Sequence, residues 1–230
     1  MSAPSPPAVA SPPIAAATLI VLREGAAQTE VLMLRRQHAL NAFGGLWVFP
    51  GGKIEAADRT YAAWLEALAD TLPAADLFTG VPGGAPEMGS HASRVAAIRE
   101  TFEETGLLYA SAADPAFGPR YQRHREDWRV AVTRDGSAFE ALLAAEQAKP
   151  DLHALHYWLR MVPPLDVPRR FDTDFFLALA PDGQEPRVDL RESMEFRWVP
   201  LGEADPPDLD CAPVTRIALL ELRLRLEEHG

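Results

Sequence analysis

The chain has 230 residues, 47% of them apolar and 24% charged, and its formal net charge is −11. These values are typical of a soluble globular protein, and we expect a single domain over residues 14–230 with one sizeable core. The acidic balance argues against a nucleic acid as partner, because binding to its backbone depends on clustered Lys and Arg.

Cysteine usage and hydropathy bear on the compartment. Cys211 is the lone cysteine, which excludes an internal disulfide and fits a reducing environment. No apolar run reaches about 18 residues, so we expect no membrane-spanning segment and no membrane partner. Residues 1–13 are rich in Pro and Ala and lack a basic start, which predicts a disordered leader rather than a signal peptide. We therefore expect a cytoplasmic protein.

Apolar periodicity predicts a mixed α/β order of elements. Two strands joined by a turn come first, a glutamate-rich helix follows, and further strands precede a closing helix. The expected strands cover 15–22, 30–34, 47–49, 107–110, 152–162, 175–180 and 196–199. The expected helices are 61–68, the glutamate helix that ends at Gly106, 137–147 and 213–227.

The glutamate helix is the most informative element. Glu100, Glu103 and Glu104 stand at positions i, i+3 and i+4, so their side chains fall within an arc of about 100° on one face. The opposite face is apolar and carries Val95, Ile98 and Phe102. This pattern predicts a helix with one buried stripe and one acidic stripe.

Clustered carboxylates near a helix end are unfavourable without a counter-ion. Gly106 is expected to end the helix, which places Glu103 and Glu104 in its last turn. The negative end of the helix dipole disfavours each anion there by about 0.3–1 kcal/mol, and the carboxylates repel one another. A hard divalent cation would offset both effects. A solvated acidic face is the alternative, and the Phe-Pro-Gly-Gly turn at 49–52 favours the metal site.

These residues resemble the Nudix box of the Nudix hydrolases, whose pattern is G-x5-E-x7-R-E-U-x-E-E-x-G-U. Gly52 matches the first glycine, Asp58 stands where the first Glu is expected, and Thr101 replaces an aliphatic residue. The second half of the box is matched by Arg99, Glu100, Glu103, Glu104, Gly106 and Leu107. The resemblance covers about residues 15–225 and implies an α/β/α sandwich around a mixed β-sheet.

The two halves of the box are separated by 40 residues (59–98) instead of seven. Lengthening a flexible loop to this extent costs only about 1.5 kcal/mol, so the two halves can still meet. The spacing at 61–68 predicts that the insert, residues 59–91, is partly helical. An expanded box with Ala-Ala-Asp at 56–58 and Trp64 resembles a subgroup of coenzyme A diphosphatases. The role of the insert stays open between a substrate lid, a dimer contact and decoration.

The resemblance implies hydrolysis of a phosphoanhydride with Mg²⁺ or Mn²⁺ as cofactor. It assigns Glu100, Glu103 and Glu104 as metal ligands, with the carbonyl of Gly52 as an additional one. It gives Arg99 the task of orienting the glutamates. Metal ions that bridge phosphate oxygens stabilise developing charge and lower the pKa of bound water.

The general base stays open at this stage. Glu103 within the box is one candidate. In several members of the family the base is instead a glutamate shortly before a tryptophan-containing strand. That position favours Glu192, six residues before Trp198, with Glu195 in reserve. The alternative for each is an exposed loop carboxylate.

Candidate substrate-binding residues come from a second motif. Residues 32–52 resemble the coenzyme A motif of some Nudix enzymes. Its matches are Arg36, Gly45 and residues 49–52, and its departures are Leu34, Gln37 and Asn41. Asn41 stands in place of an arginine, which removes a bidentate phosphate donor. We expect Arg36 and, in a later loop, Arg169 or Arg170 to contact phosphate.

The expected substrate is a small nucleoside diphosphate linked to another group, with coenzyme A or an acyl derivative as the first choice. An ADP-ribose or nucleotide-sugar pyrophosphatase is the alternative within the same class. A Nudix-fold sensor that binds a nucleotide without cleaving it is the alternative outside that class, and the presence of all three glutamates argues against it. Members of the family often dimerise, so a homodimer is an open alternative to a monomer.

Overall fold

The computed structural model describes residues 12–40, 42–67, 89–114, 117–165, 167, 170–203 and 209–229. Of the expected leader at 1–13 only residues 12 and 13 are described, and of the insert at 59–91 only 59–67 and 89–91. Within these ranges, no helix combines the length and the apolar character that crossing a membrane requires.

Strands and helices both occur in each half of the described chain, and a helix ends it. The strands are β1 (Ile14–Glu24), β2 (Thr29–Arg36), β3 (Trp47–Val48), β4 (Gly51–Lys53), β5 (Ala110–Ala112), β6 (Ala148–Pro150), β7 (His156–Met161), β8 (Phe171–Leu179) and β9 (Ser193–Pro200). The helices are α1 (Ala56–Ala67), α2 (His91–Thr105), α3 (Phe117–Arg134), α4 (Ala138–Ala145) and α5 (Pro213–His229), with short 3-10 turns η1 (Leu152–Ala154) and η2 (Leu201–Glu203).

β1 is the central strand of a seven-stranded sheet. It pairs in parallel with β8 along its length, from Ile14 opposite Phe171 to Leu22 opposite Leu179. Its other edge pairs antiparallel with β2 at one end and with β4 at the other. β9 pairs with β2, and β7 pairs with β8. The expected mixed sheet is therefore confirmed, and β5 and β6 form a separate two-stranded sheet.

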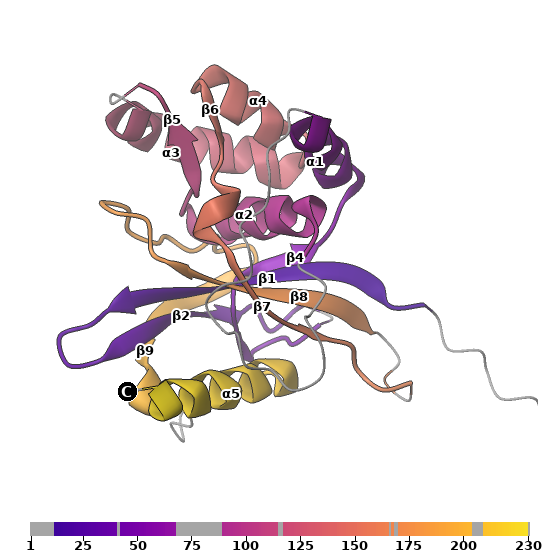
Figure 1. The fold of residues 1–230 in the computed structure, drawn as a ribbon, viewed down its shortest axis with the longest axis vertical. Coiled ribbons are helices and arrows are strands. Elements are labelled where there is room, and N and C mark those ends of the chain that lie inside the picture. Colours follow the sequence, from indigo (N-terminus) through magenta and orange to yellow (C-terminus); the bar gives the residue numbers. More distant parts are fainter. Residues whose placement is uncertain are drawn as a thin grey trace, which may run out of the picture.

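The sheet lies between two helical layers (Figure 1), with α1 to α4 on one face and α5 on the other. Alternate residues of β1 face the two layers, because successive side chains of a strand point to opposite faces. Ala17, Leu19 and Val21 pack in the core on the α2 side, whereas Ile20 packs in the core on the α5 side. This is the expected α/β/α sandwich.

Local signals fix both ends of α2. The Ser90 side chain accepts a hydrogen bond from the Ser93 backbone N–H at 3.1 Å, which is an N-cap. Gly106 ends the helix with φ 71°, and its N–H donates to the Phe102 carbonyl. The predicted apolar face is buried and comprises Val95, Ile98 and Phe102.

The first turn of the insert packs directly against α2. The helix α1 begins three residues after β4, and its Asp58 side chain accepts a hydrogen bond from the Glu55 N–H at 2.8 Å. A side chain at this position that reaches back to the helix start stabilises the first turn. Tyr61, Ala62 and Leu65 are buried, and Tyr61 and Leu65 belong to the same core as α2. The two halves of the box are therefore joined by packing, whatever path residues 68–88 take.

Several elements differ from the expectation. The expected strand at 107–110 begins only at Ala110, and the one at 152–162 divides into η1 and β7. The helix α3 over 117–134 was not predicted at all, because its buried positions are mainly Tyr121, Arg125 and Arg129 rather than an apolar stripe. Apolar periodicity cannot detect a helix whose inner face is polar.

Gly106 offers a test of how α2 ends. Because an L-residue in the left-handed region costs roughly 1–2 kcal/mol, we expect Gly106→Ala to lower the unfolding free energy by about that amount. The matched control is Gly118→Ala in α3, where an added Cβ meets nothing within 4 Å. Alanine at a helical site should leave stability equal or raise it by up to about 1 kcal/mol. Urea unfolding measures both, and equal midpoints would contradict this account.

Candidate active site

The glycine bend and the acidic stripe of α2 lie against each other. A Cβ added at Gly52 would collide with the carboxylate of Glu100, so only glycine permits this approach. The Gly51 N–H donates to Glu104 Oε2 at 3.0 Å. The two halves of the box therefore meet in one pocket despite the 40 residues between Asp58 and Arg99.

Arg99 is the hub of this pocket and is only 2% exposed. Its Nε and Nη2 donate to the two carboxylate oxygens of Asp58, at 2.8 and 2.9 Å. Its Nη2 also donates to the Lys53 carbonyl at 3.0 Å. Its Nη1 donates to Glu103 at 2.6 Å and lies 3.1 Å from Glu100. One guanidinium therefore fixes the bend, α1 and two of the three glutamates.

The charge on Arg99 is secured by its partners. Burial by itself lowers the pKa of Arg99, but the hydrogen bond to Asp58 and the carboxylates of Glu100 and Glu103 raise it above its ordinary value. A bidentate, buried arginine–carboxylate pair of this kind also imposes geometry, since two parallel hydrogen bonds fix the plane of both groups. Arg99 therefore holds the glutamates in place rather than exchanging protons.

Glu104 points to the other side of the bend. Its carboxylate is 4% exposed and lies 3.5 Å from Arg36 Nη1 at the end of β2. Among the described residues, the buried Nε of Arg36 has no hydrogen-bond partner. Arg36 therefore lies at the edge of the acidic stripe with one buried donor unsatisfied.

All three glutamates are held in a state that disfavours their charge. Burial raises the pKa of Glu100 to about 7, and the nearby Glu103 and Glu192 add to the shift. Burial also raises the pKa of Glu103, and Glu192 adds to the shift. Burial raises the pKa of Glu104 well above its ordinary value, and Glu100 and Glu192 add to that shift. The arginines offset these effects only in part. The site therefore has more negative charge than the protein itself neutralises.

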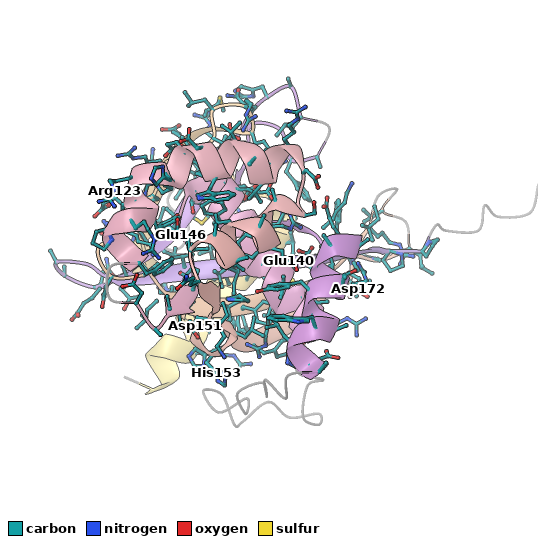
Figure 2. The ribbon with its side chains drawn as sticks, turned by 90° about the horizontal axis from the view of Figure 1, so that it is seen from above. Arg123, Glu140, Glu146, Asp151, His153 and Asp172 are labelled. Carbon is teal, nitrogen blue, oxygen red and sulfur yellow. The ribbon has the colours of Figure 1, made fainter. Side chains whose placement is uncertain are left out.

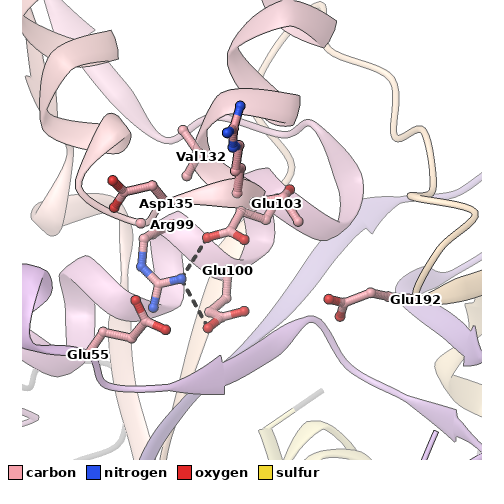
Figure 3. A pocket seen from close by; sticks show the side chains of 10 residues that line it. Glu55, Arg99, Glu100, Glu103, Val132, Asp135 and Glu192 are labelled. Carbon is pink, nitrogen blue, oxygen red and sulfur yellow. Dashed lines mark hydrogen bonds and ion pairs between the residues drawn. The ribbon is translucent and has the colours of Figure 1, made fainter.

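An open cavity of about 570 Å³ lies in front of Glu100 and Glu103 (Figure 3). Its walls come from the β4–α1 turn, α2, the α3–α4 junction and the β8–β9 loop. The lining residues are Glu55, Arg99, Glu100, Glu103, Val132, Thr133, Arg134, Asp135, Gly136 and Glu192. A cavity with this lining suits a charged, metal-associated ligand better than an apolar one.

The candidate bases separate clearly in space. Glu192 faces Glu100 and Glu103 across the cavity (Figure 3). Glu195 lies on β9 and pairs with Arg35 at 3.2 Å on the exposed surface of the sheet, away from the cavity lining. The structure therefore brings Glu192 to the acidic stripe and leaves Glu195 outside it.

Of the expected phosphate contacts that the structure describes, Arg36 lies beside the acidic stripe and Arg170 does not. Arg170 precedes β8, and its carbonyl accepts the Ile14 N–H at 2.9 Å, outside the cavity lining. Arg169 and Asn41 lie outside the described residues.

Sequence reasoning missed one wall of the cavity. This wall consists of the end of α3 at Arg134 and the two residues that follow, Asp135 and Gly136. Because the sequence did not predict α3, nothing in the sequence analysis placed these residues near the box. Glu55, which also lines the cavity, follows the glycine bend by three residues and received no role. An Asp-Gly-Ser turn is a recognisable signal in this segment: Asp135 accepts hydrogen bonds from the Ser137 N–H and hydroxyl.

The donor set fits a divalent cation. Within the described ranges, no three His, Cys, Asp or Glu side chains are already arranged as a metal cluster. Arg99 draws Glu100 and Glu103 toward itself, while Glu104 turns to Gly51 and Arg36. The glutamates offer carboxylate oxygens, which Mg²⁺ and Mn²⁺ prefer, and a cation would relieve the unfavourable charge that raises their pKa values.

Comparison with known proteins identifies relatives of this chain. A family model described as the NUDT19 Nudix domain matches residues 7–205. The human protein named acyl-coenzyme A diphosphatase NUDT19 is 32% identical over 204 residues, which cover 76% of this chain and 54% of that protein. The Gallus gallus protein of the same name is 32% identical over 222 residues, which cover 80% and 56%. The chain spans about half the length of these curated relatives.

Solved structures show the same architecture. A Nudix hydrolase from Alicyclobacillus acidocaldarius has a TM-score of 0.69 and 28% identity, and the match covers 91% of this chain and 90% of that one. The Nudix domain of Shewanella oneidensis NrtR, solved with ADP ribose, has a TM-score of 0.50 and 14% identity over 96% of this chain and 94% of that one. The second likeness extends to the fold alone.

The raised pKa of Glu100 makes stability depend on pH. Its carboxyl titrates near 4.5 in the absence of the fold and near 7 in the folded protein, so between these values the folded state binds more protons. The unfolding free energy of the metal-free protein should therefore fall as pH rises through this window. In Glu100→Gln this contribution disappears, so at pH 8 the variant should exceed wild type by on the order of 1–3 kcal/mol.

Urea unfolding in EDTA at pH 5 and pH 8 measures the effect. A variant whose unfolding free energy follows that of the wild type at both pH values would contradict the assigned burial of this carboxyl.

Proposed function

The chain belongs to the NUDT19 Nudix domain family, and on that basis we propose that it is a divalent-metal-dependent pyrophosphohydrolase of coenzyme A or its acyl derivatives. The bond cleaved is the phosphoanhydride of the diphosphate, and the products are an adenosine bisphosphate and a phosphopantetheine. The observation that carries the proposal is the acidic cavity in front of Glu100 and Glu103, on the helix α2 that packs against the glycine bend.

We assign Glu100, Glu103 and Glu104 as ligands of Mg²⁺ or Mn²⁺, with the Gly52 carbonyl as a further donor. Such ions, when bound, neutralise charge on the phosphate oxygens and lower the pKa of water. Arg99 supports this assignment because it anchors Glu103 at 2.6 Å and Glu100 at 3.1 Å from a position fixed by Asp58. Its role is to orient the ligands, as positioning contacts around metal sites do.

We assign Glu192 as the general base that takes a proton from the attacking water. Its backbone is fixed, because its carbonyl accepts the Gln37 N–H at 2.8 Å and its N–H donates to the Asp189 carbonyl at 3.0 Å. Its carboxylate faces the cavity (Figure 3). Glu103 is the weaker candidate, since its short hydrogen bond to Arg99 favours the role of a held ligand.

Two arginines near the acidic stripe are our candidate contacts for phosphate. Arg36 lies 3.5 Å from Glu104 and is our candidate contact for a metal-associated diphosphate. Arg134 lines the opposite wall and is the natural contact for a second phosphate of the substrate. Arginine suits this task, because its planar fork matches phosphate oxygens.

Hydrolysis with identified products tests the proposal. We expect release of an adenosine bisphosphate from coenzyme A or acyl-coenzyme A with Mg²⁺ or Mn²⁺, and none with EDTA. ADP-ribose and nucleotide sugars serve as competing substrates. Glu104→Gln is the matched inactive variant and should lose about 100-fold or more in kcat, because it removes one ligand of the ion. Preferred cleavage of ADP-ribose would refute the substrate, and no metal-dependent cleavage of any diphosphate would refute the activity.

Substitution of two glutamates that are three residues apart tests the assignment of the base. Glu192→Gln should lower kcat by about 10²- to 10⁴-fold and remove the acidic limb of the pH–rate profile, because it deletes the proton acceptor. Glu195→Gln is the control, since its carboxylate pairs with Arg35 outside the cavity, and its kcat should stay within about twofold of wild type. Comparable losses in both variants would contradict the assignment.

A further inference from the structure

The inner face of α3 is polar, which is unusual for a helix packed in a core. Tyr121, Arg125 and Arg129 stand at i, i+4 and i+8 and are 1%, 3% and 5% exposed. Arg123, on the outer face of the same helix, lies at the periphery of the molecule (Figure 2). Buried guanidinium groups are costly unless they are well bonded, so their partners explain why this face is polar.

The partners of Tyr121 and Arg129 are at the carboxyl end of α2, whereas Arg125 donates to the Glu185 carbonyl at 3.1 Å. The last four carbonyls of a helix have no partner within it. Tyr121 Oη donates to the Gly106 carbonyl at 2.7 Å. Arg129 donates to the Glu103 carbonyl from Nε at 3.2 Å and from Nη2 at 2.9 Å, and its Nη2 also reaches the Glu104 carbonyl at 3.3 Å. Arg129 therefore bonds the backbone of the two residues whose side chains face the cavity and the bend.

The loop that carries Glu192 is tied to the same turn. The Arg187 N–H donates to the Thr105 carbonyl at 2.7 Å, and the Asp189 N–H donates to the Glu104 carbonyl at 3.1 Å. The Asp189 carbonyl in turn accepts the Glu192 N–H at 3.0 Å. Movement of the last turn of α2 would therefore displace this loop together with the glutamates.

We propose that Arg129 is a positioning residue for the reaction, and this inference rests on the proposed function. From α3 it caps the last turn of α2, so that Glu103, Glu104 and the Glu192 loop keep one fixed arrangement. Its positive charge also lies at the negative end of the α2 dipole, where it offsets part of the cost of placing two glutamates there.

The chemistry of the group matters as much as its charge. Two nitrogens of one guanidinium bond the Glu103 carbonyl, and one of them is shared with the Glu104 carbonyl. A lysine ammonium has no such rigid fork and cannot reproduce this arrangement. Without the cap the last turn would fray, and displacement of a reacting group by about 1 Å can cost about 100-fold in rate.

The test compares two arginines of α3 that each cap a helix end. Arg129→Met removes the cap of α2. Arg120→Met is the matched control, because Arg120 donates to the carbonyl of Glu146 at 3.0 Å and to its carboxylate at 2.8 Å, at the end of α4 and outside the cavity lining. Both variants lose a guanidinium that caps a helix, but only one cap belongs to the acidic helix.

Mn²⁺ binding, followed by electron paramagnetic resonance, gives a readout that does not depend on turnover. We expect Arg129→Met to weaken Mn²⁺ binding by about 10- to 100-fold, as loss of a supporting contact does at metal sites. Its kcat should fall by about 10-fold or more, with KM within about twofold. Arg120→Met should lower the melting temperature and leave Mn²⁺ binding within about twofold of wild type.

Equal Mn²⁺ affinity in the two methionine variants would overturn the proposal. If Arg129→Met does not fold, Arg129→Lys keeps the charge and most of the volume: weaker Mn²⁺ binding then supports the proposal and wild-type binding overturns it. If the wild-type protein cleaves no diphosphate, the proposed function fails, whereas the Mn²⁺ titration still decides the role of Arg129.

Discussion

The buried ion pair between Arg99 and Asp58 is the interaction on which the site depends. It joins α2 to the start of α1. The same guanidinium also donates a hydrogen bond to the Lys53 carbonyl, next to the glycine bend. Neither charged group could be buried alone at acceptable cost, because removal of one partner leaves the other uncompensated. The two halves of the box must therefore come together when the protein folds. Because Arg99 also holds Glu100 and Glu103, folding positions these glutamates as well.

Negative charge in excess of its counter-charges then defines what the site can bind. Burial raises the pKa values of Glu100 and Glu104, and nearby carboxylates, Glu192 among them, add to both shifts. Arg36 and Arg99 compensate only part of this charge. Holding such carboxylates together makes the metal-free protein less stable. A cation that binds carboxylate oxygens offsets the excess negative charge and so stabilises the folded state. The excess negative charge therefore both destabilises the metal-free protein and favours the binding of a metal ion.

The sequence predicted the parts of the site that follow from local rules. Residue spacing placed the three glutamates on one face of α2, Gly106 gave its carboxyl end, and a loop-entropy estimate allowed the long insert. The resemblance to the Nudix family pointed to Glu192 as a candidate base, and Glu192 lines the cavity. The α3 wall escaped prediction because its identity is set by tertiary contacts: Arg125 and Arg129 are buried by what they bond, and no apolar period marks them.

Helix α3 shows why a buried helix with a polar inner face is hard to predict from sequence. A helix with arginine or tyrosine at i, i+4 and i+8 appears solvated by composition, yet these side chains are long enough to reach the carbonyls at the end of a neighbouring helix. In this chain that neighbour is α2, whose last turn bears two glutamates and therefore needs positive groups most. An acidic motif that ends a helix predicts a buried donor elsewhere in the chain. In this chain the buried donors to the end of α2 are Tyr121 and Arg129 of α3.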